Sequence, residues 1–436
     1  MNHHFPDAQH PWSRQTIAAH QWERLNAQLE YLRGRNPFWT ARLNAAGLDR
    51  GLVDEHRWRQ LPFLTKADLV ADQTDHPLYG SNLSEPLSAF LRLHQTSGTT
   101  GRPIYWLDTA ASWDWFMKCW EQIYRWIGLR PEDVVAFPFS FGPFIGFWAA
   151  FEGANRLGNR CLAMGGLSSE ARLRQILDHH CTVICCTPTY ALRLAEVAHE
   201  MGIVLAESAV RAVVVAGEPG GSVPAIRSRI AEAWGARVFD HWGMTDLGSM
   251  GIEPEHAPGA LLILESESIV EVIDPATGQP APAGQAGELV MTNLGRWGQP
   301  VLRYRTGDLV RAATEVDPRD GGLLRLDGGI LSRADDMLVI RGNNVFPSSI
   351  EAVLREFDAI CEFRFVVQTI RAMQHLRIEI EPTPEVAANA DQLRLLMERV
   401  ERTLKARLNF QAELQVATPG SLPRFELKGR RLVRES

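Results

Sequence analysis

A short run of small and hydroxyl-bearing residues between His94 and Pro103 has the composition of a phosphate-binding loop. It reads HQTSGTTGRP and follows an apolar-alternating run at residues 90–93. Glycines let a backbone approach a ligand closely, and hydroxyl and backbone N–H groups can then donate to phosphate oxygens. Only two residues separate Gly98 from Gly101 and no Lys-Ser/Thr pair follows, so this is not a P-loop NTPase. By composition alone, a surface turn explains the run equally well.

Two further motifs place a carboxylate beside small or hydroxyl-bearing residues. The first is DHWGMTD at residues 240–246, and the second is YRTGDL at residues 304–309. A carboxylate directly after Thr-Gly can accept hydrogen bonds from both hydroxyls of a ribose. Each motif alone is also explained as a polar turn, so the interpretation depends on their occurring together.

Composition limits the classes of protein that the chain can represent. Its 436 residues are enough for two or three domains, and 45% hydrophobic with 22% charged residues is typical of a soluble globular protein. A net charge of −7 argues against nucleic acid as a partner. Six scattered cysteines and the lack of a secretory leader predict the cytoplasm. The cluster Cys181, Cys185 and Cys186 lies in an apolar run and lacks the second pair that a zinc site needs.

Hydrophobic periodicity predicts the elements that carry these motifs. Helices are expected at residues 11–35, 110–127, 173–177, 190–199 and 224–234, and buried strands at 134–137, 182–186 and 211–216. Strands that alternate with helices predict an α/β fold with a parallel sheet. The uncharged run 134–151 is long enough for a membrane span, but its two prolines and two glycines argue against one.

The texture of the sequence changes twice towards the C-terminus. Short β-like runs at residues 269–275, 287–293 and 301–311 predict a small β subdomain. Beyond residue 333, the pattern predicts helices at 350–357 and 393–404 and strands at 363–367, 376–380 and 414–416. The predicted organisation is therefore a large N-terminal domain, 1–334, followed by a mobile α+β lid domain, 335–436.

The phosphate-loop string TSGTTGRP closely resembles that of the adenylate-forming superfamily, which joins acyl-CoA ligases, firefly-type luciferases and peptide-synthetase adenylation domains. The other motifs follow in the family's order. The segments NPFWTARLNAAGL and LPFLTKADL, together with the ending LPRFELKGRRLVR, resemble the phenylacetate-CoA ligase branch. The resemblance covers about residues 12–434.

The resemblance implies a role for each motif residue. Those it assigns to ATP are Thr96, Ser97, Gly98, Thr99, Thr100, Gly101, Gly217, Glu218, Pro219, His241, Trp242, Gly243, Met244, Thr245, Asp308 and Arg333. It assigns Mg²⁺ to Asp246, where the family usually has Glu. This shorter side chain leaves open whether the ion is bound directly or through water.

In the C-terminal segments the resemblance implies three roles. Lys428 bridges the substrate carboxylate and the α-phosphate and, with Thr245 and Asp246, forms the catalytic set. Asp335 is the hinge between the domains, and Gly342 lies at the CoA tunnel. A solvated basic tail is the competing explanation for the residues around Lys428.

The acyl pocket is expected to have an aromatic wall. The segment that lines it in this branch contains Phe139, Phe141, Phe144 and Trp148. Flat aromatic side chains suit a flat aromatic ligand. Core packing is the competing explanation for each of them.

Together these features predict an AMP-forming ligase. ATP, Mg²⁺ and CoA would activate an aromatic carboxylic acid as acyl-AMP and convert it to a thioester. Transfer to a carrier-protein thiol or an amine is the alternative, and a non-catalytic nucleotide binder is a third hypothesis. No nucleic-acid or membrane partner is expected, and a homodimer is left open.

Overall fold

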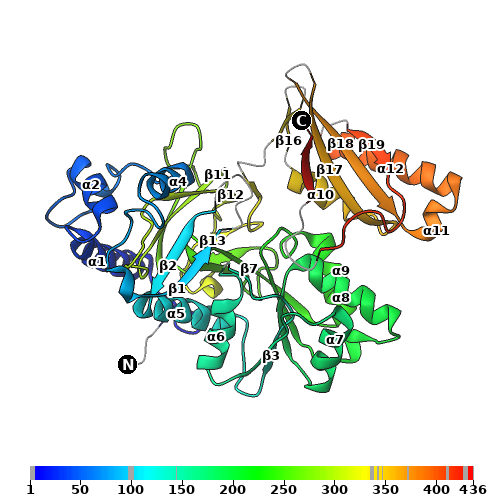
Figure 1. Ribbon diagram of the computed structural model, residues 1–436, viewed down its shortest axis with the longest axis horizontal. Coiled ribbons are helices and arrows are strands. Elements are labelled where there is room, and N and C mark those ends of the chain that lie inside the picture. Colours follow the sequence, from blue (N-terminus) through cyan, green and yellow to red (C-terminus); the bar gives the residue numbers. More distant parts are fainter. Residues whose placement is uncertain are drawn as a thin grey trace.

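The computed structural model describes residues 5–96, 103–143, 145–333, 338–340, 343–345, 347–370, 373–408, 412–425 and 431–435 (Figure 1). Its α-helices are α1 Arg14–Leu32, α2 Pro37–Ala45, α3 Glu55–Trp58, α4 Lys66–Asp75, α5 Ala110–Trp126, α6 Trp148–Arg156, α7 Ser169–Asp178, α8 Pro188–Glu200, α9 Pro224–Trp234, α10 Pro347–Leu354, α11 Pro384–Ala387 and α12 Ala390–Leu408. Within the described residues, no helix is long and apolar enough to cross a membrane.

Side-chain caps fix where several helices begin. Ser13, Asn36 and Thr187 each accept a hydrogen bond from a backbone N–H in the first turn of α1, α2 and α8. At α4, Thr65 and Asp68 cap each other's backbone N–H groups in a capping box. These bonds satisfy donors that the first helical turn leaves without a partner. The helices predicted at the positions of α1, α5, α7, α8 and α9 are all present.

An eight-stranded sheet forms the centre of the molecule, in the order β13-β9-β8-β7-β6-β5-β3-β4. Its strands are β3 Val134–Phe137, β4 Arg160–Ala163, β5 Val183–Cys186, β6 Ala212–Ala216, β7 Arg237–Met244, β8 Gly248–Ile252, β9 Leu261–Ile263 and β13 Arg325–Leu326. The predicted parallel sheet is confirmed from β4 to β7. Beyond β7 the sheet continues antiparallel, because the turn at residues 245–247 is too short for a crossover helix.

The parallel strands bring their carboxyl ends to one edge of this sheet. The predicted aromatic wall follows β3, the helix α8 follows β5, the segment 217–219 follows β6, and the turn 245–247 follows β7. Ligands of open α/β sheets bind at this edge. The topology therefore places several motifs near one another although they are far apart in the sequence.

Two smaller sheets pack beside the central one. The hairpin β1 Phe90–Gln95 and β2 Tyr105–Thr109 flanks residues 97–102, and the predicted β subdomain is an antiparallel sheet of β10 Ser268–Ile273, β11 Ala286–Asn293, β12 Tyr304–Arg311 and β14 Ser332–Arg333. Arg303 ties this subdomain to the N-terminal segments. Its guanidinium binds both carboxylate oxygens of Glu271 and the carbonyls of Arg59 and Leu61.

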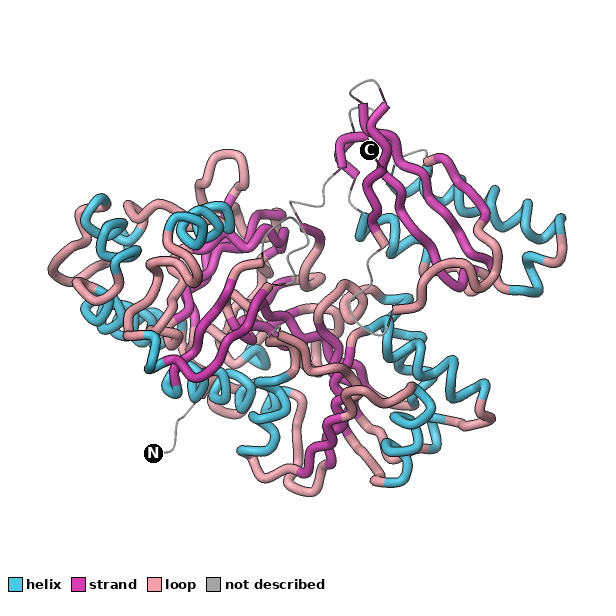
Figure 2. Tube along the Cα trace, in the orientation of Figure 1, coloured by secondary structure: helices cyan, strands magenta, loops and turns pink. Residues whose placement is uncertain are grey.

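The C-terminal residues form a sheet and hydrophobic core of their own. The sheet has β15 Leu338–Ile340, β16 Asn343–Val345, β17 Ile360–Ile370, β18 Met373–Pro382, β19 Glu413–Val416 and β20 Leu432–Glu435. Helices α10 and α12 pack against it. Figures 1 and 2 show this unit beside α8 and α9, away from α1 and α2. The domain boundary at 334/335 lies outside the described residues and stays a prediction.

We predict that Arg303→Ala lowers the midpoint of thermal unfolding by several degrees, equivalent to about 3 kcal/mol, because it leaves Glu271 and two carbonyls without their partner. The matched control is Arg319→Ala, which breaks an exposed ion pair with Asp317 and should leave the midpoint unchanged. Equal midpoints for the two variants would contradict the structural role of Arg303.

Candidate active site

The carboxylate of Asp308 binds two other predicted motif residues. Trp242 Nε1 donates to Asp308 Oδ2 over 2.9 Å, and Arg333 Nη1 donates to Asp308 Oδ1 over 3.0 Å. Asp308 and Arg333 are direct cross-strand partners on β12 and β14, whereas Trp242 comes from β7 of the central sheet. A carboxylate oxygen can accept more than one hydrogen bond, which suits a group that also accepts bonds from ribose hydroxyls.

Local backbone bonds set the position of Asp308. Gly307 has a φ of +75°, a left-handed conformation that favours glycine. The hydroxyl of Thr306 donates to the carbonyl of Leu289 and accepts the backbone N–H of Asp308. In Thr-Gly-Asp, the threonine and the glycine therefore fix the backbone that carries the carboxylate of the aspartate.

The second motif carboxylate, Asp246, lies in the turn between β7 and β8. It is buried, and within the described residues its Oδ1 has no hydrogen-bond partner. Burial raises the pKa of Asp246, while the charges of Arg296 and Lys66 act in the opposite direction. A buried carboxylate oxygen without a donor is a suitable ligand for Mg²⁺, so this residue fits the ion that the family uses.

Close backbone packing explains the glycine in this motif. A Cβ at Gly243 would lie 2.7 Å from the carbonyl oxygen of Gly248 on the neighbouring strand. The register between β7 and β8 shifts between Trp242 and Gly243. Met244 and Thr245 follow, both half-buried, at the end of the motif.

The predicted adenine-flanking segment lies at the contact with the C-terminal unit. Gly217 and Pro219 are exposed, and Glu218 Oε1 accepts the backbone N–H of Thr189 on α8 over 2.8 Å. The hydroxyl of Thr189 in turn accepts a bond from Arg431 Nη2, which precedes β20, over 3.3 Å. The N-terminal part of the chain and the C-terminal unit therefore meet beside this segment.

The predicted aromatic wall is a continuous set of ring contacts that reaches the nucleotide motif. Ring centroids of Phe139 and Phe141 lie 4.5 Å apart, and those of Phe141 and Trp148 lie 4.6 Å apart. Phe147 contacts Phe139 at 5.3 Å. Through Trp120 the same cluster extends to the motif residue His241, as Trp120 lies 6.3 Å from Phe147 and 4.6 Å from His241.

Two buried titratable groups precede Trp242 on β7. Burial lowers the pKa of His241 to about 4, and its Nδ1 lies 2.7 Å from the carbonyl of Gly251. Burial, with the nearby charge of Glu253, raises the pKa of Asp240 to about 8. Near neutral pH the imidazole is thus uncharged, and the Asp240 carboxyl carries a proton.

Several predicted residues lie outside the described part of the chain, and their roles stay predictions. They are Ser97, Gly98, Thr99, Thr100, Gly101, Phe144, Asp335, Gly342 and Lys428. Thr96 is described, and it closes the base of the predicted loop. Its N–H donates to the carbonyl of Ile104, and its hydroxyl accepts the N–H of Ile104, which leaves the hydroxyl hydrogen available for a ligand.

Family models match both parts of the chain. The "AMP-binding enzyme" model matches residues 72–295, and the "AMP-binding enzyme C-terminal domain" model matches residues 342–435. A phenylacetate-coenzyme A ligase of Thermus thermophilus is 31% identical over 433 residues, which is 95% of both chains. This chain belongs to the AMP-binding enzyme family.

Solved structures agree with that assignment. A 2-hydroxyisobutyryl-CoA ligase in the postadenylation state, in complex with its acyl-AMP, is 29% identical with a TM-score of 0.92, covering 98% of this chain and 91% of that one. The same ligase in the thioesterification state, with acyl-AMP and CoA, gives 0.73 at 30% identity over 98% and 91%. The protein is thus an adenylate-forming, AMP-producing acid–thiol ligase that uses ATP and CoA, and Mg²⁺ is typical of its family.

No sequence pattern indicates two buried residues near the motifs of this AMP-binding enzyme, Arg296 and Asp108. Arg296 and Asp108 form a buried pair across 188 residues, with no local motif around either.

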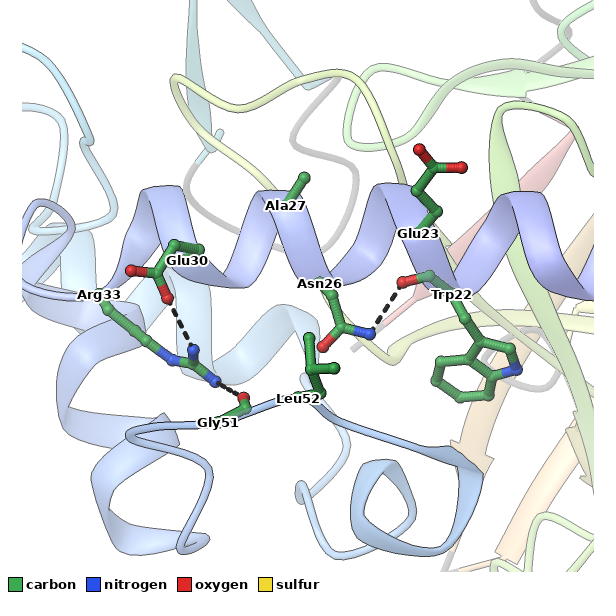
Figure 3. Close-up of a pocket in the computed structure, with 8 residues that line it drawn as sticks. All are labelled: Trp22, Glu23, Asn26, Ala27, Glu30, Arg33, Gly51 and Leu52. Atoms are coloured by element: carbon green, nitrogen blue, oxygen red, sulfur yellow. Dashed lines mark hydrogen bonds and ion pairs between the residues drawn. The ribbon is translucent and has the colours of Figure 1, made fainter.

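A surface pocket of about 590 Å³ on α1, lined by Trp22, Glu30 and Leu52 among others, contains none of the motif residues (Figure 3). There Arg33 is already bound to Glu30 and to the carbonyl of Gly51, so the described residues that line the pocket provide no free cation for a nucleotide.

We predict that unfolding free energy falls between pH 6.5 and 8 by up to about 1 kcal/mol per pH unit because of Asp240. Its pKa rises from 3.8 to about 8 on folding, so between these values the folded state binds the extra proton and stability decreases as pH rises. His241, with a pKa lowered from 6.5 to about 4, has the opposite effect only below pH 6.5.

Denaturant titrations at pH 6.5, 7, 7.5 and 8 check this expectation against Asp240→Asn, which keeps the shape and removes the proton equilibrium. The variant should show a flatter profile than the parent over this range. Parallel profiles for the two proteins would show that Asp240 does not change its protonation on folding.

Proposed function

We propose that this ligase activates an aromatic carboxylic acid as acyl-AMP and then transfers the acyl group to CoA. The observation that supports an aromatic substrate is the series of ring contacts from Trp148 and Phe141 to His241. Trp148 and Phe141 are only half-buried, so part of each ring is accessible. The exposed faces of aromatic rings favour a flat apolar ligand.

In the first half-reaction, the substrate carboxylate oxygen attacks the α-phosphorus of ATP and pyrophosphate leaves. Asp308 and Arg333 would hold the ribose, and the hydrogen bond from Trp242 to one oxygen of Asp308 supports this role. Asp246 would hold Mg²⁺, which neutralises phosphate charge when bound. The ammonium of Lys428 would offset the repulsion between the two approaching anions.

In the second half-reaction, the thiolate sulfur of CoA attacks the acyl carbonyl and AMP leaves. Two orientations of the C-terminal unit would serve the two steps. The arrangement of this chain is closer to the relative in its postadenylation state than to the same relative in its thioesterification state, with TM-scores of 0.92 and 0.73. The contact of Arg431 with Thr189 is present in this arrangement, which is similar to the postadenylation state of the relative.

Acid-dependent pyrophosphate release, followed by mass spectrometry of the CoA product, tests the proposal. The panel should contain phenylacetate, benzoate and heteroaryl acids, with 2-hydroxyisobutyrate as the aliphatic comparison because a structural relative is named for it. An aryl acid should have the highest kcat/KM, and its CoA thioester should appear. Preference for 2-hydroxyisobutyrate would contradict the aromatic substrate, and release of pyrophosphate without any CoA thioester would favour a carrier protein or amine.

We predict that Phe141→Ala or Trp148→Ala raises KM most for small rigid aryl acids and spares bulkier ones, because truncation enlarges the pocket. Loss of ring contact should change kcat/KM by about 10- to 100-fold. Phe151→Ala is the matched control, since its ring contacts Phe141 from α6 and was not predicted to line the pocket. An equal loss for every acid, in step with reduced thermal stability, would show that Phe141 and Trp148 serve only the core.

We predict that Lys428→Ala abolishes acyl-AMP formation and leaves thioester formation from supplied acyl-AMP largely intact. The reason is that its charge is needed only while the carboxylate meets the α-phosphate. Pyrophosphate release and thioester formation are measured separately, with the exposed Lys405→Ala on α12 as control. Equal loss of both half-reactions in a folded Lys428→Ala protein would contradict this division of roles.

A further inference from the structure

A buried arginine binds the backbone of the turn that carries Thr245 and Asp246. Arg296 Nη1 donates to the carbonyl oxygen of Thr245 over 2.7 Å and to that of Asp246 over 3.3 Å. Its other nitrogens bind Asp108, with Nε to Oδ1 at 2.8 Å and Nη2 to Oδ2 at 2.7 Å. Both side chains are completely buried.

Two aromatic rings restrict the orientation of the guanidinium. It lies over the rings of Trp106 and Phe116, at 4.7 and 5.2 Å from their centroids. Burial would raise the pKa of Asp108, but the charge of Arg296 holds it below its ordinary value. The pair is therefore ionised, and a planar fork with donors on two sides is required to bind a carboxylate and two carbonyls together.

Asp108 also reaches the strand that leads into the predicted phosphate loop. It lies on β2, and His94 Nδ1 on the neighbouring β1 is 3.7 Å from its Oδ2. The His94 ring is stacked on Trp113 at 5.5 Å, which fixes its plane. Two residues after His94, Thr96 closes the base of the loop.

We propose that Asp108 and Arg296 are positioning residues that fix the Asp246 carboxylate relative to the phosphate-loop strand. This inference rests on the proposed role of Asp246 as the Mg²⁺ ligand. Stability alone is a poor explanation for such a pair, because apolar residues of similar volume serve a core as well as a buried ion pair. Contact with the two carbonyls of the ligand-bearing turn gives the pair a specific task.

The test is Arg296→Lys, which keeps the charge but cannot form the fork. We expect Mn²⁺, used as the probe ion with ATP present and followed by its electron paramagnetic resonance signal, to bind about 10- to 100-fold more weakly. The Mg²⁺ concentration for half-maximal pyrophosphate release should rise in parallel, while KM for the acid changes little. Arg172→Lys is the matched control, because Arg172 is an equally buried arginine that binds the carbonyl of Met164 and the hydroxyl of Tyr190.

Asp108→Asn provides a second variant if Arg296→Lys does not fold. It preserves the shape and removes the charge that orients the guanidinium, so Mn²⁺ affinity should fall in the same direction by a smaller factor. Unchanged Mn²⁺ affinity and Mg²⁺ dependence in a folded Arg296→Lys protein, or in Asp108→Asn where the former is unfolded, would overturn the proposal.

Asp246→Asn separates this inference from the proposed function. If Asp246→Asn binds Mn²⁺ as the parent does, the assignment of Mg²⁺ to Asp246 is wrong, and the positioning role is wrong with it. If Asp246→Asn loses the ion but Arg296→Lys keeps it, Asp246 remains the ligand and only the positioning role is rejected.

Discussion

The hydrogen bonds of Asp308 to Trp242 and Arg333 are the interaction on which the arrangement of the site depends. They connect the central sheet, which ends its parallel part at β7, to the antiparallel sheet of β12 and β14. A buried carboxylate is stable in this position only while its oxygens have donors. The same donors fix the carboxylate that we propose binds the ribose, so the contact between the two sheets and the proposed ribose site depend on the same hydrogen bonds.

The change from parallel to antiparallel pairing has a chemical consequence. A short turn replaces a crossover helix after β7, and this turn carries Thr245 and Asp246. Its backbone carbonyls point away from solvent and need donors, which Arg296 supplies. The change to antiparallel pairing thus has two effects. It places the proposed metal ligand in a short turn, and it leaves the carbonyls of that turn in need of a buried donor such as Arg296.

Much of this could be predicted from the sequence, because local patterns carry the information. The predicted helix 224–234 and strand 134–137 coincide with α9 and β3. Likewise, the sequence pattern indicates the motifs that contain Trp242 and Asp308, although not the contact between them. Gly-rich β8 and three-residue β9 have too little apolar periodicity to indicate the antiparallel half of the sheet.

Long-range polar pairs could not be predicted in the same way. Arg296 and Asp108 are 188 residues apart, and Arg431 and Thr189 are 242 apart, so no periodicity or motif links them. Sequence patterns show which residues are apolar on a local face, whereas a buried ion pair requires the tertiary fold to exist first. Arg296 would look like one more charged residue in a loop after β11.

The central claim, that Asp308 anchors an acyl-adenylate, is tested most directly by calorimetric titration with an aryl acyl-sulfamoyl adenosine, a non-reactive analogue of acyl-AMP. The account predicts one analogue bound per chain, with an affinity about 100-fold lower in Asp308→Ala, or about 2.7 kcal/mol. Trp242→Phe should show a smaller loss, because it removes one donor to Asp308 but keeps an aromatic ring. Equal affinity of folded Asp308→Ala and parent protein for the analogue would contradict the account.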